Sequence, residues 1–345
     1  MSSKNNAIKA AQERIRSNRS AYGDVTKLAS EVVDGKTEAL ARAITLIESE
    51  KPDDRPLAHE LLKLVRIEST VTSNRIGITG IPGVGKSTFI ERFGLDLIEN
   101  GNKVAVLAVD PSSKRTGGSI LGDKTRMEKL SNNPNAFVRP SPAADALGGV
   151  ARATMEAIIL CEAAGYDSII VETVGVGQSE TSVRDMVDVF CLLLIGGAGD
   201  EVQGIKRGIV EMADIVVVHK SDSGNEAMCK DTASAYRSSL HLFPKPKGGN
   251  TVEVLTASSV EGTGHVEFRN KVDSLVKLWR ENGHFNSQRI AQRVERMRIH
   301  ARDLLMENRM TSKGSKEHWK ELSDKVENGE ISAFSAAWSW VNKSG

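Results

Sequence analysis

The sequence has little of what several common classes of protein require. Its three cysteines, Cys161, Cys191 and Cys229, lie far apart, so no pair has the spacing of a metal site or a redox motif. We therefore expect a reduced compartment and a cytoplasmic location. The formal net charge is only +1 over 345 residues, so no overall field draws the chain to nucleic acid or to a membrane surface.

Long apolar runs are absent as well. No stretch reaches the roughly 20 residues that a membrane-spanning helix needs, and we expect no membrane partner. Residues 1–19 are polar, basic and poor in acids. A secretory signal is therefore not expected, whereas a mitochondrial transit segment and a polar helix both fit this composition. The content of 39% apolar and 26% charged residues is that of an ordinary globular protein.

The strongest signal that the sequence does contain lies at residues 80–87, which read Gly-Ile-Pro-Gly-Val-Gly-Lys-Ser. They match the phosphate-binding pattern G-x-x-x-x-G-K-S/T. An apolar run at residues 76–79 predicts a strand before the loop, and residues 88–100 predict a helix after it. In that setting the glycines let main-chain N–H groups surround a triphosphate, and the start of the helix adds partial positive charge.

Two side chains of this loop have separate roles in the predicted site. Lys86 neutralises the outer phosphates, and Ser87 places its hydroxyl on Mg²⁺. The predicted nucleotide contacts from this segment are Gly80, Gly83, Val84, Gly85, Lys86, Ser87 and Thr88.

Short apolar runs alternate with helical patterns between about residues 74 and 282. The runs are residues 76–79, 104–109, 136–138, 168–172, 189–195, 215–218 and 252–255. Most are apolar throughout, as in a parallel sheet that is covered on both faces. The sequence thus predicts an α/β fold of the P-loop NTPase type with a mostly parallel central sheet. Functional residues are then expected at the carboxyl ends of the strands.

Helical extensions are expected on both sides of this region. Residues 1–70 form the predicted N-terminal extension, residues 71–283 the P-loop domain, and residues 284–345 a C-terminal arm. Apolar residues recur at heptad-like spacing in the arm: Ile290, Val294, Met297, Ala301 and Leu304. This seam fits pairing with another subunit and also fits packing on the chain's own domain.

Two further groups in the arm carry expectations. The arginines at positions 289, 293, 296, 298 and 302 are expected to form a solvated flank. A final helical face is predicted from the spacing of Ile331, Phe334, Trp338 and Val341.

Acidic residues supply the candidate metal ligands. Glu172 ends an apolar run, and Gly175 follows three residues later. The acid could hold Mg²⁺ through water while the glycine N–H meets the γ-phosphate. Asp110 offers a second acid at a strand end, and two carboxylates suit a hard cation that keeps several waters. Asp123 lies in a glycine-rich stretch and fits either a contact to the metal or the attacking water, or the N-cap of a helix.

A sequence similar to the guanine-reading motif N-K-x-D follows the strand pattern at residues 215–218. Asp222 would accept hydrogen bonds from guanine N1–H and the 2-amino group, which adenine does not offer, and the stem of Lys220 would lie over the base. His219 stands where Asn is usual, and one of its nitrogens could replace part of the Asn contacts. Ser258 and Ser259 belong to a second base-contacting loop, whose N–H groups would meet guanine O6.

Together these motifs resemble those of the MeaB/ArgK family of P-loop GTPases, which includes the human methylmalonic aciduria type A protein. The matching stretches are residues 39–48, 80–88, 110–113, 117–126, 171–180 and 199–206. The resemblance spans about residues 30–345. It implies a SIMIBI-type G domain that uses GTP and Mg²⁺ and forms a homodimer through the C-terminal arm.

The same resemblance implies a role as a GTP-dependent chaperone of adenosylcobalamin-dependent methylmalonyl-CoA mutase. Such proteins gate cofactor loading and protect the mutase. Residues 199–206 would form an additional switch loop that faces this partner. The sequence contains no cobalamin-binding D-x-H-x-x-G signature, so the link to the mutase depends on the resemblance.

The predicted catalytic set is Lys86 with Mg²⁺ for charge stabilisation, and Asp123 or Glu172 to orient the attacking water. Glycine-rich loops surround the predicted site, at residues 117–118, 175–177 and 196–199. We therefore expect slow turnover by the isolated protein and faster turnover when a partner orders the loops.

Other P-loop functions would show different features. A GTPase metallochaperone for nickel enzymes usually carries a His-rich tract or a Cys–His site, whereas the seven histidines here are scattered. A small-molecule kinase or a transport-linked ATPase should prefer ATP, against which Asp222 argues. A partitioning-type ATPase needs an additional lysine early in the loop, where Ile81 and Pro82 stand.

Overall fold

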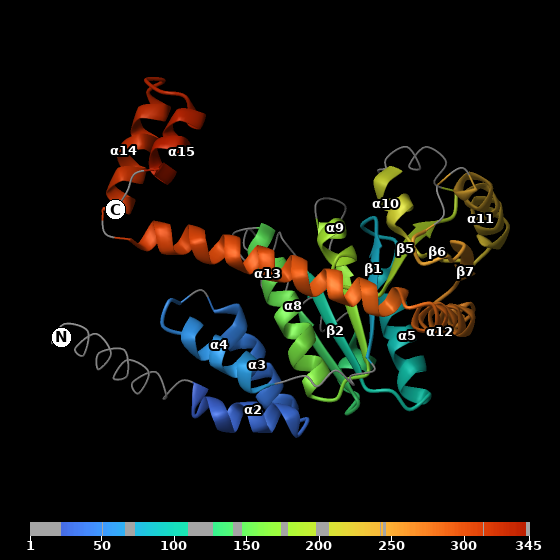
Figure 1. Ribbon diagram of the computed structural model, residues 1–345. Coiled ribbons are helices and arrows are strands. Elements are labelled where there is room, and N and C mark those ends of the chain that lie inside the picture. The colour runs from blue at the N-terminus through green and yellow to red at the C-terminus, as the bar shows by residue number, and fades with distance from the viewer. Residues whose placement is uncertain are drawn as a thin grey trace. The chain divides into compact units, whose positions relative to one another are not determined.

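The computed structural model describes residues 22–49, 51–65, 73–109, 127–140, 147–173, 179–197, 207–241, 243, 246–312 and 314–342 (Figure 1). The chain divides into two compact units, Met1–Arg289 and Ile290–Gly345. The boundary between them falls inside one long helix, α13 (His284–Thr311).

A parallel sheet forms the centre of the first unit. Its strands are β1 (Asn74–Gly80), β2 (Val104–Val109), β3 (Ala136–Pro140), β4 (Ser168–Thr173), β5 (Val189–Ile195), β6 (Ile215–His219) and β7 (Glu253–Ala257). They pair in the order β3-β2-β4-β1-β5-β6-β7, and every pair is parallel. The prediction of an α/β fold with a parallel sheet is therefore confirmed, and the strand that leads into the glycine loop lies in the middle.

Helices cover both faces of this sheet (Figure 1). On one face lie α8 (Leu147–Ala163), α9 (Ser179–Arg184), α10 (Arg207–Met212) and α11 (Glu226–Leu240), and on the other lie α5 (Lys86–Glu99), α7 (Glu128–Ser131) and α12 (His265–Glu281). Successive strand residues serve opposite faces: Ile169 and Val171 pack with the α8 side, and Ile170 packs with the α5 side. Burial on both sides explains why most of the strands are apolar throughout.

The N-terminal helices α2 (Val25–Val33), α3 (Thr37–Glu48) and α4 (Arg55–Leu64) add to the core on the α8 side. Leu40 and Ile44 of α3 are fully buried, and α3 packs directly on α8. Helix α2 lies within the N-terminal extension, which the sequence predicts to be helical. Its start is marked by Asp24, whose carboxylate accepts a hydrogen bond from the main-chain N–H of Thr26 at 2.9 Å.

The second unit contains most of α13 and the helical hairpin of α14 (Ser315–Glu327) and α15 (Ala333–Asn342). Trp340 holds the hairpin together, because its indole lies 4.7 Å from that of Trp319 and its Nε1 donates to the Ser315 carbonyl at 3.2 Å. The predicted face of α15 is the outer one: Phe334 and Trp338 are 77% and 64% exposed. None of the helices in the described ranges combines the length and apolar character needed to span a bilayer.

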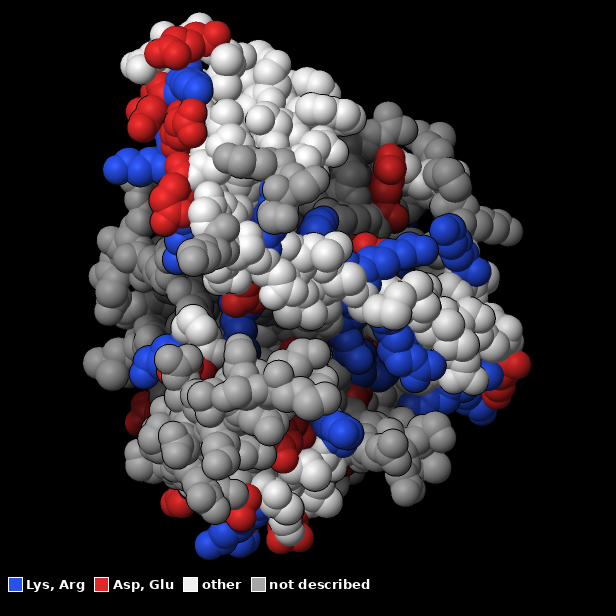
Figure 2. Space-filling view, turned by 60° about the vertical axis from the view of Figure 1, so that its left-hand side comes forward, with Lys and Arg blue, Asp and Glu red and all other residues white. Residues whose placement is uncertain are grey.

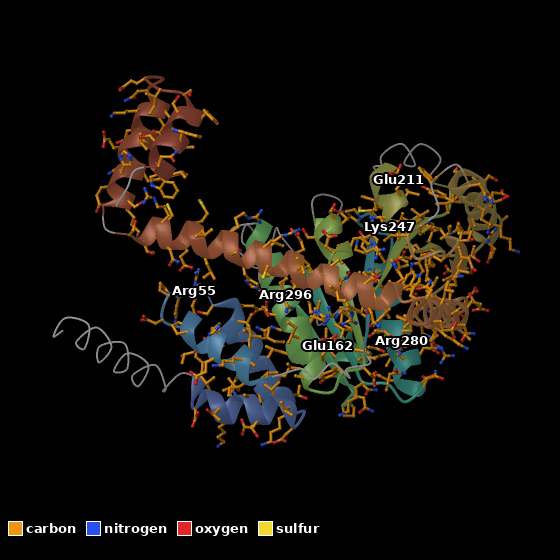
Figure 3. The ribbon with its side chains drawn as sticks, viewed as in Figure 1. Arg55, Glu162, Glu211, Lys247, Arg280 and Arg296 are labelled. Carbon is orange, nitrogen blue, oxygen red and sulfur yellow. The ribbon has the colours of Figure 1, made fainter. Side chains whose placement is uncertain are left out.

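Arg289 corrects one expectation, because its side chain is only 14% exposed and is not part of a solvated flank. Its guanidinium donates to the Asp188 carboxylate at 2.6 Å and to the Glu162 carboxylate at 2.9 Å. Glu162 lies on α8 (Figure 3). Arg75 also donates to Glu162, at 2.8 Å. Burial alone would raise the pKa of Glu162, but the hydrogen bonds and charge of Arg75, together with the charge of Arg289, hold that pKa below its usual range. The cluster joins the first turns of α13 to the amino-terminal edge of the sheet.

Candidate functional site

The glycine loop lies at the carboxyl edge of the sheet, between β1 and α5. Gly85 caps α5 with a φ of 93°, in the left-handed region that glycine adopts without strain. A Cβ atom on Gly85 would lie 2.9 Å from two atoms of the His219 ring, and one on Gly80 would lie 2.6 Å from the Leu193 carbonyl oxygen. Only glycine therefore fits at these two positions of the loop.

Lys86 begins α5, and its side chain turns back over the loop that precedes it. Its ammonium donates to the carbonyl of Gly80 at 2.8 Å and to that of Ile81 at 3.3 Å. Burial lowers the pKa of Lys86, and the charges of Glu172 and Glu180 oppose that shift. An ammonium has three donors, so two carbonyl contacts leave one for an anion above the loop.

Ser87 and Glu172 meet beside Lys86. The Ser87 hydroxyl donates to the Glu172 carboxylate at 3.2 Å, and Glu172 is 5% exposed. They meet because β4 pairs with β1 in a register that sets Ile78 opposite Glu172. A hydroxyl and a carboxylate are the hard oxygen ligands that Mg²⁺ prefers, so these two groups fit the predicted ion.

Three of the predicted site residues, Asp110, Asp123 and Gly175, lie outside the described residues. Within the described ranges, no group of three or more His, Cys, Asp or Glu side chains could hold a metal ion. Val84 is buried in the loop, and Thr88 is exposed on the first turn of α5.

The predicted base-reading residues occupy two neighbouring loops at the same edge of the sheet. Lys220 follows β6 with a φ of 62° and donates from its ammonium to the Gly83 carbonyl at 2.8 Å. The Asp222 carboxylate accepts a hydrogen bond at 2.5 Å from the hydroxyl of Ser258, which follows β7. The structure thus brings Lys220 against the phosphate loop and links Asp222 to the second base loop.

His219 lies between these loops and is only 3% exposed. Its Nδ1 is 2.8 Å from the Val84 carbonyl oxygen, and its Nε2 is 2.7 Å from the Ser259 hydroxyl. Burial lowers the pKa of His219. Both ring nitrogens of His219 therefore have protein partners. His265, which no motif indicated, lies 3.2 Å from the Ser259 hydroxyl through its Nε2.

Comparison with known proteins identifies the family to which the chain belongs. The family model described as methylmalonyl Co-A mutase-associated GTPase MeaB matches residues 40–314. The chain belongs to the MeaB family. It is 49% identical over 314 residues to a putative GTPase of Caulobacter vibrioides, a match that covers 91% of this chain and 96% of the relative.

Two further similarities of this MeaB-family chain extend the comparison. It is 42% identical over 322 residues to a mitochondrial methylmalonic aciduria type A homolog of Mus musculus, which covers 91% of this chain and 78% of the relative. The crystal structure of an LAO/AO transport system kinase, 33% identical, superposes with a TM-score of 0.70 and covers 92% of this chain and 96% of that chain. The MeaB-family chain is a P-loop GTPase, and its ligand is a guanine nucleotide.

Proposed function

We propose that this GTPase is a chaperone of adenosylcobalamin-dependent methylmalonyl-CoA mutase, or of a related cobalamin-dependent acyl-CoA mutase. Its nucleotide state gates cofactor loading and protects the mutase. The observation that carries the proposal is the match of residues 40–314 to a family described as associated with that mutase. The glycine loop with Lys86 and Ser87 at its end supplies the means of sensing GTP.

In this proposal the phosphates lie over the glycine loop. Lys86 contacts the outer phosphates, and main-chain N–H groups from Gly83 to Thr88 bind their oxygens. The contacts of Lys86 to the Gly80 and Ile81 carbonyls support this role, because they hold the ammonium over the loop. The Gly175 N–H would contact the γ-phosphate, as in other nucleotide-dependent switches.

Ser87 and Glu172 are the proposed holders of Mg²⁺, with Asp110 and Asp123 as further ligands. When bound, the ion neutralises charge on the β- and γ-phosphates. Glu172 or Asp123 would orient the attacking water, and Lys86 would stabilise the charge that develops on the transferred group. The hydrogen bond between Ser87 and Glu172 supports this set, because it places two hard oxygen groups together.

Guanine recognition depends on Asp222 in this proposal, and its amide variant provides a test. Asp222→Asn should weaken GTP binding by about a hundredfold, because an amide NH₂ then faces the N1–H and 2-amino donors of guanine. The same variant should gain affinity for xanthosine triphosphate, whose base carries a carbonyl in place of the amino group. Competition against a fluorescent GDP measures both changes. Asp231→Asn, on the exposed side of α11, is the matched control; equal GTP affinity in the two variants would remove Asp222 from the site.

Coupling to the mutase is tested by turnover. We expect slow GTP hydrolysis by the isolated protein and a rise of roughly tenfold or more with stoichiometric adenosylcobalamin-dependent mutase, because partner contacts order the loops around the γ-phosphate. Phosphate release at saturating GTP is the measurement, and mutase with Lys86→Ala protein is the control. Unchanged turnover, together with no complex in light scattering, would refute the chaperone proposal and leave the GTPase intact.

A homodimer formed through the C-terminal arm is also part of the proposal. Apolar residues of the heptad-like seam are exposed on α13: Ile290 at 53%, Val294 at 40%, Met297 at 64% and Leu304 at 53%. An apolar stripe of this kind favours a second helix as its cover.

We infer a cytoplasmic location, since Cys161, Cys191 and Cys229 are all buried free thiols. Acidic and basic side chains both occur on the face shown in Figure 2, and the net charge is +1.

A further inference from the structure

A line of polar side chains, two buried histidines with the half-buried Ser259 between them, connects the second base loop to the phosphate loop. His265 Nε2 lies 3.2 Å from the Ser259 hydroxyl, which lies 2.7 Å from His219 Nε2. His219 Nδ1 in turn lies 2.8 Å from the Val84 carbonyl oxygen. His265 and His219 are 1% and 3% exposed. We call these three side chains, His265, Ser259 and His219, the histidine–serine chain.

Chemistry fixes the direction of every hydrogen bond in the histidine–serine chain. The Val84 carbonyl can only accept, so His219 carries its proton on Nδ1 and donates it there. Neutral His219 then has a bare Nε2, which accepts from the Ser259 hydroxyl. The Ser259 oxygen is left to accept from the Nε2–H of His265. All the donors thus point from His265 towards the phosphate loop, an arrangement in which each bond strengthens the next.

The surroundings of His265 agree with this assignment. Its Nδ1 is buried and has no hydrogen-bond partner, which suits a bare nitrogen better than an N–H that would lack an acceptor. Burial, with smaller effects from the charges of His219 and Arg92, lowers the pKa of His265 to about 4. The ring of Phe89, on α5, packs against both imidazoles, with centroids 4.7 Å from His265 and 5.5 Å from His219. Both histidines are therefore neutral near pH 7.

The last bond of the chain fixes the plane of one peptide group in the phosphate loop. A trans peptide is planar, and its C=O and N–H point in opposite directions. When His219 holds the Val84 carbonyl, the N–H of Gly85 must face away from His219. The His219 ring also packs against Gly85 itself, where an added Cβ would lie 2.9 Å from the ring. The orientation of this peptide thus depends on where His219 is held.

We propose that His265 and Ser259 are positioning residues for nucleotide binding, which act through His219 to orient the Gly85 N–H towards the phosphates. This inference rests on the nucleotide site proposed above. The histidine–serine chain also couples the base-binding half of that site to its phosphate-binding half, because Ser259 belongs to the loop that meets the base. An Asn at position 219 could donate to Val84 but ends short of Ser259, so the coupling depends on histidine at this position.

Two variants of His265 separate its hydrogen bond from its packing. His265→Phe keeps an aromatic ring against Phe89 and removes the donor, whereas His265→Gln keeps an N–H close to the position of Nε2. We expect His265→Phe to raise the Kd for GTP and GDP about fivefold, and His265→Gln to stay within about twofold of the wild type. The KM for GTP should rise in His265→Phe while kcat stays unchanged, since the lost contact serves ground state and transition state alike.

Several results would overturn the inference. Equal affinity in both variants and the wild type would do so, and so would equal loss in both, because the donor would then be irrelevant. Should His265→Phe fail to fold, the tautomer of His219 provides the test. In ¹⁵N-histidine spectra of the wild type, the signals of His219 are those that are missing from the spectra of His219→Gln. These signals should show that the proton of His219 is on Nδ1. A proton on Nε2 of His219 would contradict the hydrogen-bond directions of the histidine–serine chain.

Failure of the inference can be told apart from failure of the site on which it rests. Normal GTP affinity in His265→Phe, with loss of affinity in Lys86→Ala, would reject only the histidine–serine chain. Absence of guanine nucleotide binding in the wild type would reject both.

Discussion

Replacing Lys86 by alanine should lower the affinity for GTP and GDP by at least about a hundredfold, since a charged hydrogen-bond donor to the phosphates is lost from a desolvated position. The loop should still fold, because its glycines and its hydrogen bonds to His219 and Lys220 remain. Calorimetric titration of GDP into Lys86→Ala and wild-type protein, with Mg²⁺ present, measures the difference.

The control for this variant is Lys103→Ala. Lys103 is exposed and directly precedes β2, at the amino-terminal edge of the sheet and therefore away from the proposed site. It removes the same charge from the protein, so a general electrostatic effect would appear in both variants. Nucleotide affinity that is unchanged in Lys86→Ala, or lowered equally in both, would contradict the assignment of the phosphate loop.

The second large effect concerns stability. Arg289→Ala should lower the free energy of unfolding by about 3 kcal/mol, because it leaves the buried carboxylate of Asp188 without its main partner. The Asp188 and Glu162 side chains are 0% and 2% exposed. Glu162 keeps Arg75 as a partner, which places the expected loss at the lower end for a broken buried ion pair. Urea unfolding followed by circular dichroism measures it.

Arg293→Ala is the matched control, since Arg293 lies one helical turn further along α13 and is exposed. It should change the free energy of unfolding by less than about 0.5 kcal/mol. Arg289→Lys should fall between the two, because lysine keeps the charge but cannot contact both carboxylates with a planar fork. Equal stability of Arg289→Ala and Arg293→Ala would show that the cluster contributes nothing.

Most strands of the fold were predictable because they are buried on both faces and therefore apolar throughout. Every predicted run falls on a strand, with shifts of one or two residues at the ends. The order of the strands in the sheet was not predictable, because a short apolar run carries no information about its neighbours. The register of β4 against β1, which sets Ile78 opposite Glu172, was not predictable for the same reason.

The site divides in the same way. The phosphate loop was visible because its residues are contiguous, and Glu172 because an acid interrupts an apolar run. The partners of His219 were not visible, since Val84 lies 135 residues away in the sequence and Ser259 lies 40 away. His265 is a lone histidine at the start of a helix, a feature that no motif marks. Arg289 was misassigned because helical spacing cannot show that a carboxylate from another element covers one position.

The most direct test of guanine recognition at the carboxyl edge of the sheet is a competition titration. Fluorescent GDP bound to the wild-type protein in Mg²⁺ is displaced with GTP and, separately, with ATP. The Asp222 carboxylate can accept hydrogen bonds from guanine, whereas adenine offers no donor at that edge. GTP should therefore displace the probe at concentrations at least about a hundredfold lower than ATP. Displacement by ATP at the same concentration as GTP would contradict the proposed site.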